Sequence, residues 1–188
     1  MIPVKEAKSI IHKHIPLSGT ETVFLKDAGN RILAQDIIAT FPMPSFDNSA
    51  MDGFAVRAVD TKGTDQSLPV TLKMVGVSSA GSPGDITLGP GECAQCMTGA
   101  IIPNGADAIV MVEDTSGFSD TDSVQIFQEA KTGKHIREKG EEIQDRDMLI
   151  PKGTHITPNE IGTLATFGYG EISVAKKPRV AIFGTGDE

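Results

Sequence analysis

The chain of 188 residues lacks the features that define several classes of protein. No run approaches the roughly 20 apolar residues that a membrane-spanning helix needs. The first residues, MIPVKE, have neither the basic region nor the apolar core of a signal peptide. Basic residues are in deficit, because 17 Lys and Arg stand against 25 Asp and Glu for a net charge of -8. We therefore expect a cytoplasmic protein with no membrane and no nucleic acid as partners, since nucleic acid requires a basic face.

Cysteine is nearly absent, and Cys93 and Cys96 are the only two. They lie three positions apart in a predicted β-strand, so their side chains point to opposite faces. With no second pair and no nearby His, buried free thiols are expected rather than zinc. His12 and His14 lie two apart on a predicted helix and point in different directions, so a shared metal is not expected there.

The amino-acid composition is typical of a globular chain rich in turns. Apolar residues make up 39% and charged residues 22%, and 20 Gly with 11 Pro favour short strands over a helical bundle. The length allows one to two domains. Because the net charge is -8, an anionic substrate would need a metal ion or a local cluster of Lys and Arg.

Hydrophobic periodicity predicts the elements of the first two thirds of the chain. Apolar positions at helical spacing predict an amphipathic helix over residues 3–15. Strands are predicted at 22–26 and 35–40, separated by turn residues at 27–30. From Gly53 onward a strand start at 54–56 is followed by short strands at 70–77, 92–97, 108–113 and 124–129. This spacing is typical of a compact, mainly antiparallel β domain or barrel, with an exposed hairpin tip at 115–123.

The last third returns to a mixture of helix and strand. Thr157 as N-cap, Pro158 at the first position and Glu160 three after the cap predict a helix over 158–167 that closes at Gly168. A strand is predicted at 171–175. Since the first and last segments share this character, we expect them to pair into one domain with the β domain inserted between them.

One loop concentrates polar turn residues more than any other part of the chain. It reads PMPSFDNSAMDGFAV over residues 42–56. Asp47, Asn48 and Ser49 favour turns through hydrogen bonds from side chain to backbone, and Gly53 permits backbone angles that other residues avoid. Its composition alone leaves two interpretations open, a structural corner or a loop that holds functional groups.

This loop closely resembles a motif of the MoeA and gephyrin E-domain family, the molybdopterin molybdenumtransferases. Four further stretches agree with that family in order and spacing. They read MTGAIIPNGADAIV at 97–110, REKGEEI at 137–143, PNEIGTLA at 158–165 and PRVAIFGTGDE at 178–188. The resemblance covers nearly the whole chain, and five ordered motifs are far more specific than one.

The expected fold class is α+β, mainly β, with three parts. Residues 1–45 and 140–176 would form a discontinuous mixed domain that the family uses for dimerisation, and 46–139 the inserted β domain. The apolar run 180–183 predicts a buried parallel strand, followed by a glycine loop suited to phosphate. Because nothing remains to cover that strand, we expect 177–188 to open a truncated α/β domain, and the chain to be an N-terminal fragment.

The resemblance implies insertion of molybdate into the dithiolene of adenylylated molybdopterin, with release of AMP and help from Mg²⁺. Carboxylates suit such chemistry, because hard oxygen ligands hold Mg²⁺ against a pyrophosphate. The implied catalytic residues are Asp52, Glu142, Asp187 and Glu188, of which the last two would also bind the metal. The implied substrate-binding residues are Asp47, Asn48, Ser49, Thr98, Arg137, Gly184, Thr185 and Gly186.

Each of these residues has a structural alternative. Asp52 could only cap the turn before Gly53, and Thr98 could be a turn hydroxyl before Gly99. Arg137 could bind phosphate or pair with the acidic run that follows it. That run could be an ordinary solvated face, and it comprises Glu141, Glu142, Asp145 and Asp147.

The chain departs from the family pattern at two of these positions. Glu142 stands where members commonly carry Asp, which lengthens the reach of the carboxylate by one methylene. Gly184 stands where members commonly carry Ser, which removes a hydroxyl donor.

Two other hypotheses compete with the enzyme interpretation. The chain could be a non-catalytic module for dimerisation or scaffolding, inactive by itself, because a site shared with an absent domain cannot close. It could also belong to a relative that handles tungstate, an oxyanion of nearly the same size and charge as molybdate. The family implies a homodimer, and molybdopterin adenylyltransferase as the upstream partner.

Overall fold

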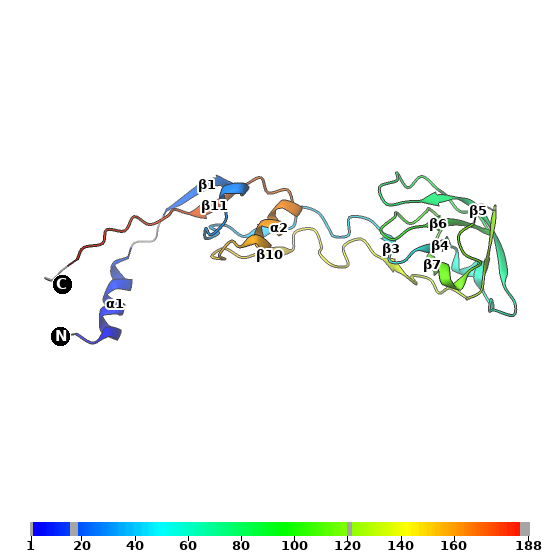
Figure 1. The fold of residues 1–188 in the computed structure, drawn as a ribbon, viewed down its shortest axis with the longest axis horizontal. Helices are drawn as coiled ribbons and strands as arrows, with labels where there is room; N and C mark the ends of the chain where they lie inside the picture. The colour runs from blue at the N-terminus through cyan, green and yellow to red at the C-terminus, as the bar shows by residue number, and fades with distance from the viewer. Residues whose placement is uncertain (1, 16–18, 120–121, 185–188) are drawn as a thin grey trace. The chain divides into compact units, whose positions relative to one another are not determined.

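The computed structural model describes residues 2–15, 19–119 and 122–184 (Figure 1). It divides into two compact units, the first made of Met1–Thr40 with Arg146–Glu188 and the second of Phe41–Asp145. The predicted boundaries at 45/46 and 139/140 differ from these by five or six residues. The reason is that the connecting segments bond to each other, since Met43 N–H donates to Ile143 O at 2.7 Å and Gly140 N–H to Pro44 O at 2.9 Å.

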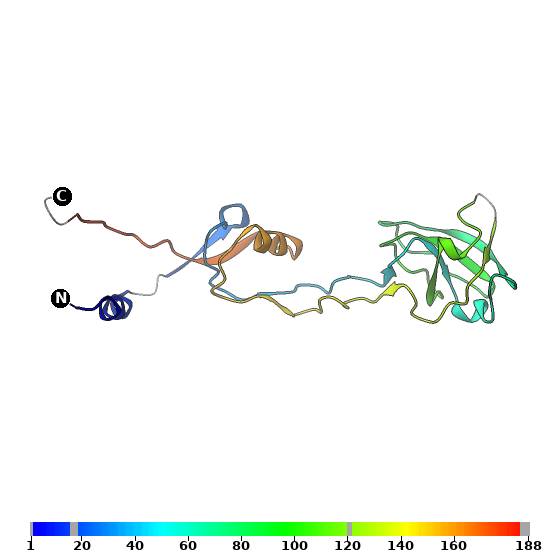
Figure 2. The ribbon, with the colours of Figure 1, turned by 60° about the horizontal axis from the view of Figure 1, so that its bottom comes forward.

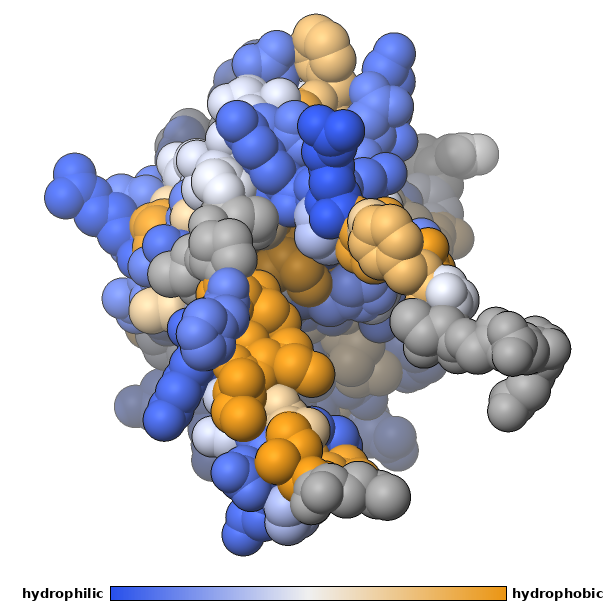
Figure 3. Space-filling view, turned by 90° about the vertical axis from the view of Figure 1, so that its left-hand side faces the viewer, coloured by the Kyte–Doolittle hydropathy of each residue, from blue (hydrophilic) through white to orange (hydrophobic). Residues whose placement is uncertain are grey.

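The first unit begins with helix α1, Val4–His14, as the sequence predicts. Pro3 is its N-cap, and Glu6 in the first turn with Lys13 and His14 in the last complements the helix dipole. No residue of α1 is buried. Its apolar positions Ile10 and Ile11 are exposed, and apolar side chains are visible on the surface of this unit (Figure 3).

The core of the first unit lies between two short antiparallel ladders and one helix (Figure 1). Strand β1, Thr20–Phe24, pairs with β11, Glu171–Ala175, and β2, Ile37–Ile38, pairs with β10, Met148–Ile150. Helix α2, Pro158–Thr166, has the predicted capping box between Thr157 and Glu160. The buried side chains are Ala28, Leu33, Ile37, Ile150, Ile156, Leu164, Ile172 and Val174.

The second unit is built on a five-stranded mixed sheet of order β7-β4-β6-β5-β8. Figure 2 shows the strands of this unit in cyan and green. The strands are β4 Gly53–Val56, β5 Val70–Ser78, β6 Glu92–Cys96, β7 Ala108–Met111 and β8 Ser123–Ile126. All neighbours are antiparallel except β5 and β6. The predicted mainly antiparallel β domain and the α+β fold class are therefore confirmed.

Side chains from this sheet pack into clusters on both of its faces. Phe54 and Cys93 belong to one cluster, whereas Ala55 and Cys96 belong to the other. Burial raises the pKa of Cys93 to about 12 and that of Cys96 to about 11. The prediction of buried free thiols on opposite faces is confirmed.

Several of the predicted strands are absent, shorter or replaced by another element in the structure. Residues 180–183 form no strand and are exposed, because nothing among the described residues pairs with them. The predicted strand at 35–40 is reduced to β2, and 112–114 form a 3₁₀ helix, η3 Val112–Asp114. Two further 3₁₀ helices are η1 Leu25–Asp27 and η2 Ala58–Thr61.

The segment predicted as a hairpin tip, 115–123, is only partly described. Thr115 is buried and forms a bridge with Ile126, and the ring of Phe118 lies 5.5 Å from that of Phe54. Positions 120 and 121 lie outside the described residues. Within the described ranges, no helix has the length and apolarity to cross a membrane.

Candidate functional site

The polar loop at 42–56 is held between two other segments of the second unit. Its short strand β3, Asn48–Ser49, pairs with β9, Ile136–Arg137. On the other side, Ser49 N–H donates to Ala100 O at 3.0 Å and Gly99 N–H donates to Ser49 O at 2.8 Å. Three of the stretches that resemble the family, 42–56, 97–110 and 137–143, therefore meet at β3, although they are distant in sequence.

Asp52 and Thr98 form the most specific polar contact at this junction. The Oδ1 atom of Asp52 accepts hydrogen bonds from Thr98 N–H and from Thr98 Oγ1, both at 2.7 Å. These bonds, the backbone one first, hold the pKa of Asp52 below its usual range. Asp52 is exposed, and its Oδ2 atom has no hydrogen-bond partner among the described residues. The arrangement presents a charged carboxylate with one fixed and one open oxygen.

The position of Asp52 is set by the strand that follows it. Val112 N–H donates to Asp52 O at 3.1 Å, and Gly53 pairs with Met111 across β4 and β7. A Cβ atom at Gly53 would lie 2.0 Å from Val110 O, so only glycine allows this close approach. Gly53 thus lets Asp52 reach the turn that contains Thr98.

Asp47 anchors the opposite end of the loop and lies between two hollows. Its Oδ1 atom accepts from Lys139 N–H at 2.8 Å, and its carbonyl accepts from Ile102 N–H at 3.2 Å. One hollow of about 370 Å³ and another of about 330 Å³ both have Asp47, Ile102 and Ala106 in their walls.

Two of the four residues between Asp47 and Asp52, namely Asn48 and Ser49, are buried. Asn48 Nδ2 donates to Phe46 O at 3.2 Å, and Ser49 Oγ donates to Met51 O at 2.5 Å. Asn48 is 5% exposed and Ser49 is 0% exposed. Their polar groups therefore hold the shape of the loop, which leaves Asp47 and Asp52 at its surface.

Arg137 and Glu142 are exposed and lie on the segment that returns from this junction. The backbone of Arg137 pairs with Asn48, and Glu142 N–H donates to Met43 O at 3.1 Å. Within the described part of the chain neither side chain forms an ion pair. The alternative in which Arg137 pairs with the acidic run is not observed there, so its guanidinium faces solvent.

Four of the residues implied by the family lie outside the described residues, namely Thr185, Gly186, Asp187 and Glu188. Gly184 is described and exposed. Over the ranges that the structure describes, no three His, Cys, Asp or Glu side chains are grouped so that they could hold a metal ion. The described residues alone therefore do not fit a Mg²⁺ site.

Asp107 is a site residue that sequence reasoning did not single out. Its Oδ1 accepts from Ala58 N–H at 2.6 Å, its Oδ2 from Thr132 Oγ1 at 3.1 Å, and its carbonyl from Gly133 N–H at 2.7 Å. It lines the hollow of about 370 Å³ beside Asp47. The only signal for it was its place inside the stretch 97–110, since its partners are distant in sequence.

The fold and site define an α+β protein whose inserted β unit carries a carboxylate loop. A solved structure of molybdopterin biosynthesis MoeA protein from Pyrococcus horikoshii OT3 is similar, with a TM-score of 0.86 and 30% identity, covering 95% of this chain and 47% of that chain. A family model described as the MoeA N-terminal region (domain I and II) matches residues 2–168. The chain belongs to this family.

Curated relatives are similar over the whole chain. Molybdopterin molybdenumtransferase of Staphylococcus aureus (strain Mu50 / ATCC 700699) is 42% identical over 187 residues, and that of Bacillus subtilis (strain 168) is 41% identical over 189 residues. Each match covers 100% of this chain and 44% of the relative. The chain thus spans less than half the length of these relatives.

Proposed function

We propose that the chain acts as part of a molybdopterin molybdenumtransferase in molybdenum cofactor biosynthesis. In this role it would serve the insertion of molybdate into adenylylated molybdopterin with release of AMP. Family membership over residues 2–168 and the names of the curated relatives support the reaction class. The observation that carries the proposal for this chain is the exposed, ionised Asp52 carboxylate held by Thr98.

The geometry separates the roles of Asp52 and Thr98. Both donors of Thr98 are used by Asp52, so Thr98 positions the carboxylate and can meet a ligand only through its oxygen lone pairs. A lowered pKa keeps Asp52 charged near neutral pH, which suits a hydrogen-bond acceptor or a base more than an acid. Its open Oδ2 is the atom that would receive a proton or a donor from the substrate.

Mg²⁺ belongs to the proposal as the counter-charge for an anionic substrate beside an acidic chain. It would neutralise phosphate oxygens, with Asp187 and Glu188 as its protein ligands. Arg137, Asp47 and the loop Gly184–Gly186 are the proposed contacts to the substrate, and Glu142 a further acid. Molybdopterin adenylyltransferase is the proposed supplier of the adenylylated substrate, in the cytoplasm, and tungstate is an alternative oxyanion.

A second candidate function, assembly without catalysis, is favoured by one observation. The apolar residues Val4, Ile10 and Ile11 of α1 are exposed, although helices of this pattern normally bury such a face. A homodimer through the first unit would cover them. Under this alternative the chain contributes a docking surface and the loop at Asp52 is structural.

A hybrid protein tests the two functions. This chain is joined to the remaining part of the Bacillus subtilis relative, and AMP release from adenylylated molybdopterin is measured with molybdate and Mg²⁺. We expect turnover by the hybrid, none by the 188-residue chain alone, and a loss of about 100-fold or more in Asp52→Asn. Asp36→Asn is the matched control, because exposed Asp36 accepts a backbone N–H from Lys152 at 2.7 Å in the other unit.

The outcomes separate the candidates. Equal turnover in Asp52→Asn and Asp36→Asn would show that Asp52 takes no part in the reaction. A hybrid that folds and dimerises but releases no AMP would favour assembly over catalysis.

A further inference from the structure

Ser78, the last residue of strand β5, holds both ends of the turn that carries Thr98. Met97 N–H donates to Ser78 O at 3.0 Å, and Ser78 Oγ donates to Ile101 O at 2.8 Å. Ser78 is 1% exposed, so water competes little for these two bonds. A single buried residue therefore fixes the place where the turn begins and the place where it ends.

A β-bulge brings Ser78 to this position. Between its paired positions 74 and 77, strand β5 has one more residue than the facing stretch 93–95 of β6. Ser78 consequently pairs with Cys96, which lies just before the turn. Without the extra residue Val77 would stand opposite Cys96, and the turn would lose its hydroxyl donor.

The other contacts of the turn do not replace the Ser78 hydroxyl. Ser49 holds the turn through its backbone, since its carbonyl accepts from Gly99 N–H at 2.8 Å. The Cys96 thiol approaches Ile101 O at 4.0 Å, but a thiol is a weak donor. Loss of the Ser78 side chain should therefore loosen the turn at its far end.

The position of the turn decides the position of the Asp52 carboxylate. Thr98 N–H and Thr98 Oγ1 both donate to Asp52 Oδ1 at 2.7 Å. Because hydrogen bonds weaken steeply with distance and angle, a shifted turn would hold the carboxylate less firmly. A misplacement of about 1 Å in a catalytic group can lower a rate about 100-fold.

We propose that Ser78 is a positioning residue for Asp52 and acts through the turn that carries Thr98. The inference rests on the proposed function, because the position of Asp52 affects turnover only if Asp52 takes part in the reaction. The placement of the carboxylate itself needs no substrate, so the two are tested by separate measurements.

Carboxyl ¹³C NMR titration of the 188-residue chain measures the placement through the pKa of Asp52. Ser78→Ala removes the hydroxyl, so the bonds from Thr98 should weaken and the pKa of Asp52 should rise toward its ordinary value. Ser78→Cys keeps a side chain of similar size with only a weak donor, and it should raise the pKa as well. Ser78→Thr retains a hydroxyl and should restore the wild-type pKa.

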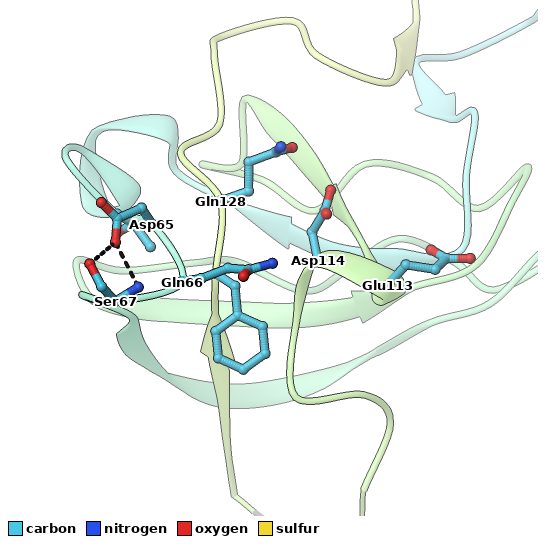
Figure 4. Close-up of a pocket in the computed structure, with 8 residues that line it drawn as sticks. Asp65, Gln66, Ser67, Glu113, Asp114 and Gln128 are labelled. Atoms are coloured by element: carbon cyan, nitrogen blue, oxygen red, sulfur yellow. Dashed lines mark hydrogen bonds between the residues drawn. The ribbon is translucent and has the colours of Figure 1, made fainter.

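Asp65 is an internal reference in the same spectra. It lies on the wall of a groove of about 470 Å³ in the second unit, and its Oδ1 atom accepts from Ser67 Oγ at 2.6 Å and from Ser67 N–H at 2.7 Å (Figure 4). These bonds, that of the hydroxyl first, lower the pKa of Asp65. Because the donors are only two residues away in the chain, this pKa should not respond to Ser78→Ala.

Thr61→Val is the matched control for a general loss of stability. Thr61 is 0% exposed, and it follows β4 whereas Asp52 precedes it. Its hydroxyl donates to Ala58 O at 2.9 Å and accepts from Ala130 N–H at 2.9 Å. Since two bonds are lost, Thr61→Val should lower the melting temperature at least as much as Ser78→Ala, yet leave the pKa of Asp52 unchanged.

Turnover is measured in the hybrid with the remaining part of the Bacillus subtilis relative. Ser78→Ala should lower kcat about 10-fold and leave KM within about 2-fold, because the loss falls on a group that acts in the transition state. Ser78→Thr should recover most of the kcat.

Three results would overturn the proposal. They are a pKa of Asp52 that neither Ser78→Ala nor Ser78→Cys changes, an equal rise of that pKa in Thr61→Val, and an unchanged kcat for Ser78→Ala in a hybrid that Asp52→Asn inactivates. A wild-type hybrid without turnover would contradict the proposed function, whereas the pKa of Asp52 would still show whether Ser78 positions it.

Discussion

At the scale of residues, two aspartates of the second unit share one hydrogen-bond arrangement, but with different consequences. Asp65 and Asp52 each use one carboxylate oxygen to collect a backbone N–H and a hydroxyl. For Asp65 the donors lie two and three residues away, whereas for Asp52 they lie 46 residues away. The pKa of Asp52 is therefore lowered only when the tertiary fold is formed.

This difference predicts how Asp52 titrates. In the folded chain its pKa should lie below its ordinary value, so the stabilisation is present above the unfolded-state pKa and is lost as the pH falls through the folded-state pKa. Thr98→Val removes the hydroxyl but keeps the larger backbone contribution, so the pKa should rise only part of the way. Carboxyl ¹³C NMR measures both values, with Thr40→Val as a remote control. A pKa unchanged by Thr98→Val would mean that the Thr98 hydroxyl does not donate to Asp52 in solution.

At the scale of elements, the patterns that predicted correctly are those whose cause is local. The capping box of α2 and the strand β11 are as expected, because Thr157, Glu160 and the alternating residues of 171–175 act within a few positions. The short strands β3, β9 and β10 were not predicted, since two or three residues show no period. They exist only because distant segments pair.

For the candidate site too, local sequence predicts some features and only the tertiary fold reveals the others. The sequence identified Asp52 and Thr98 through motifs, but only the fold shows that they bond to each other and that Ser49 is buried. Asp107 depends on partners far along the chain, and no local pattern marks it.

Strand β4 provides a prediction at this scale. Gly53→Ala should destabilise the second unit by about 3 kcal/mol or more, because its Cβ would meet a backbone oxygen that cannot move without breaking the β4–β7 ladder. Gly29→Ala, with nothing within 4 Å of its Cβ, is the control and should stay near wild type. Urea unfolding followed by circular dichroism gives both values. A Gly53→Ala protein as stable as Gly29→Ala would show that the strands can separate there.

At the scale of the whole molecule, each unit has a core of its own. Leu72 is buried in the second unit and Leu164 in the first. Leu72→Ala and Leu164→Ala should each cost about 2–5 kcal/mol, and each should increase hydrogen exchange only in its own unit. Leu68→Ala, at a position 68% exposed, is the control and should change neither. Equal loss of protection across both units after either core substitution would mean that they unfold as one body.

The pairing of β1 with β11 also fixes an order of events during synthesis. β1 ends at Phe24, and the strand that completes its ladder begins at Glu171. At the usual rate of roughly 5–20 residues per second, a ribosome needs about 7 to 30 s to make the chain between them. Strands β4 to β8 all emerge in that interval and need no later residue for their own ladders. The middle of the chain is thus the first part able to finish folding, and the unit that was begun first is the last to close.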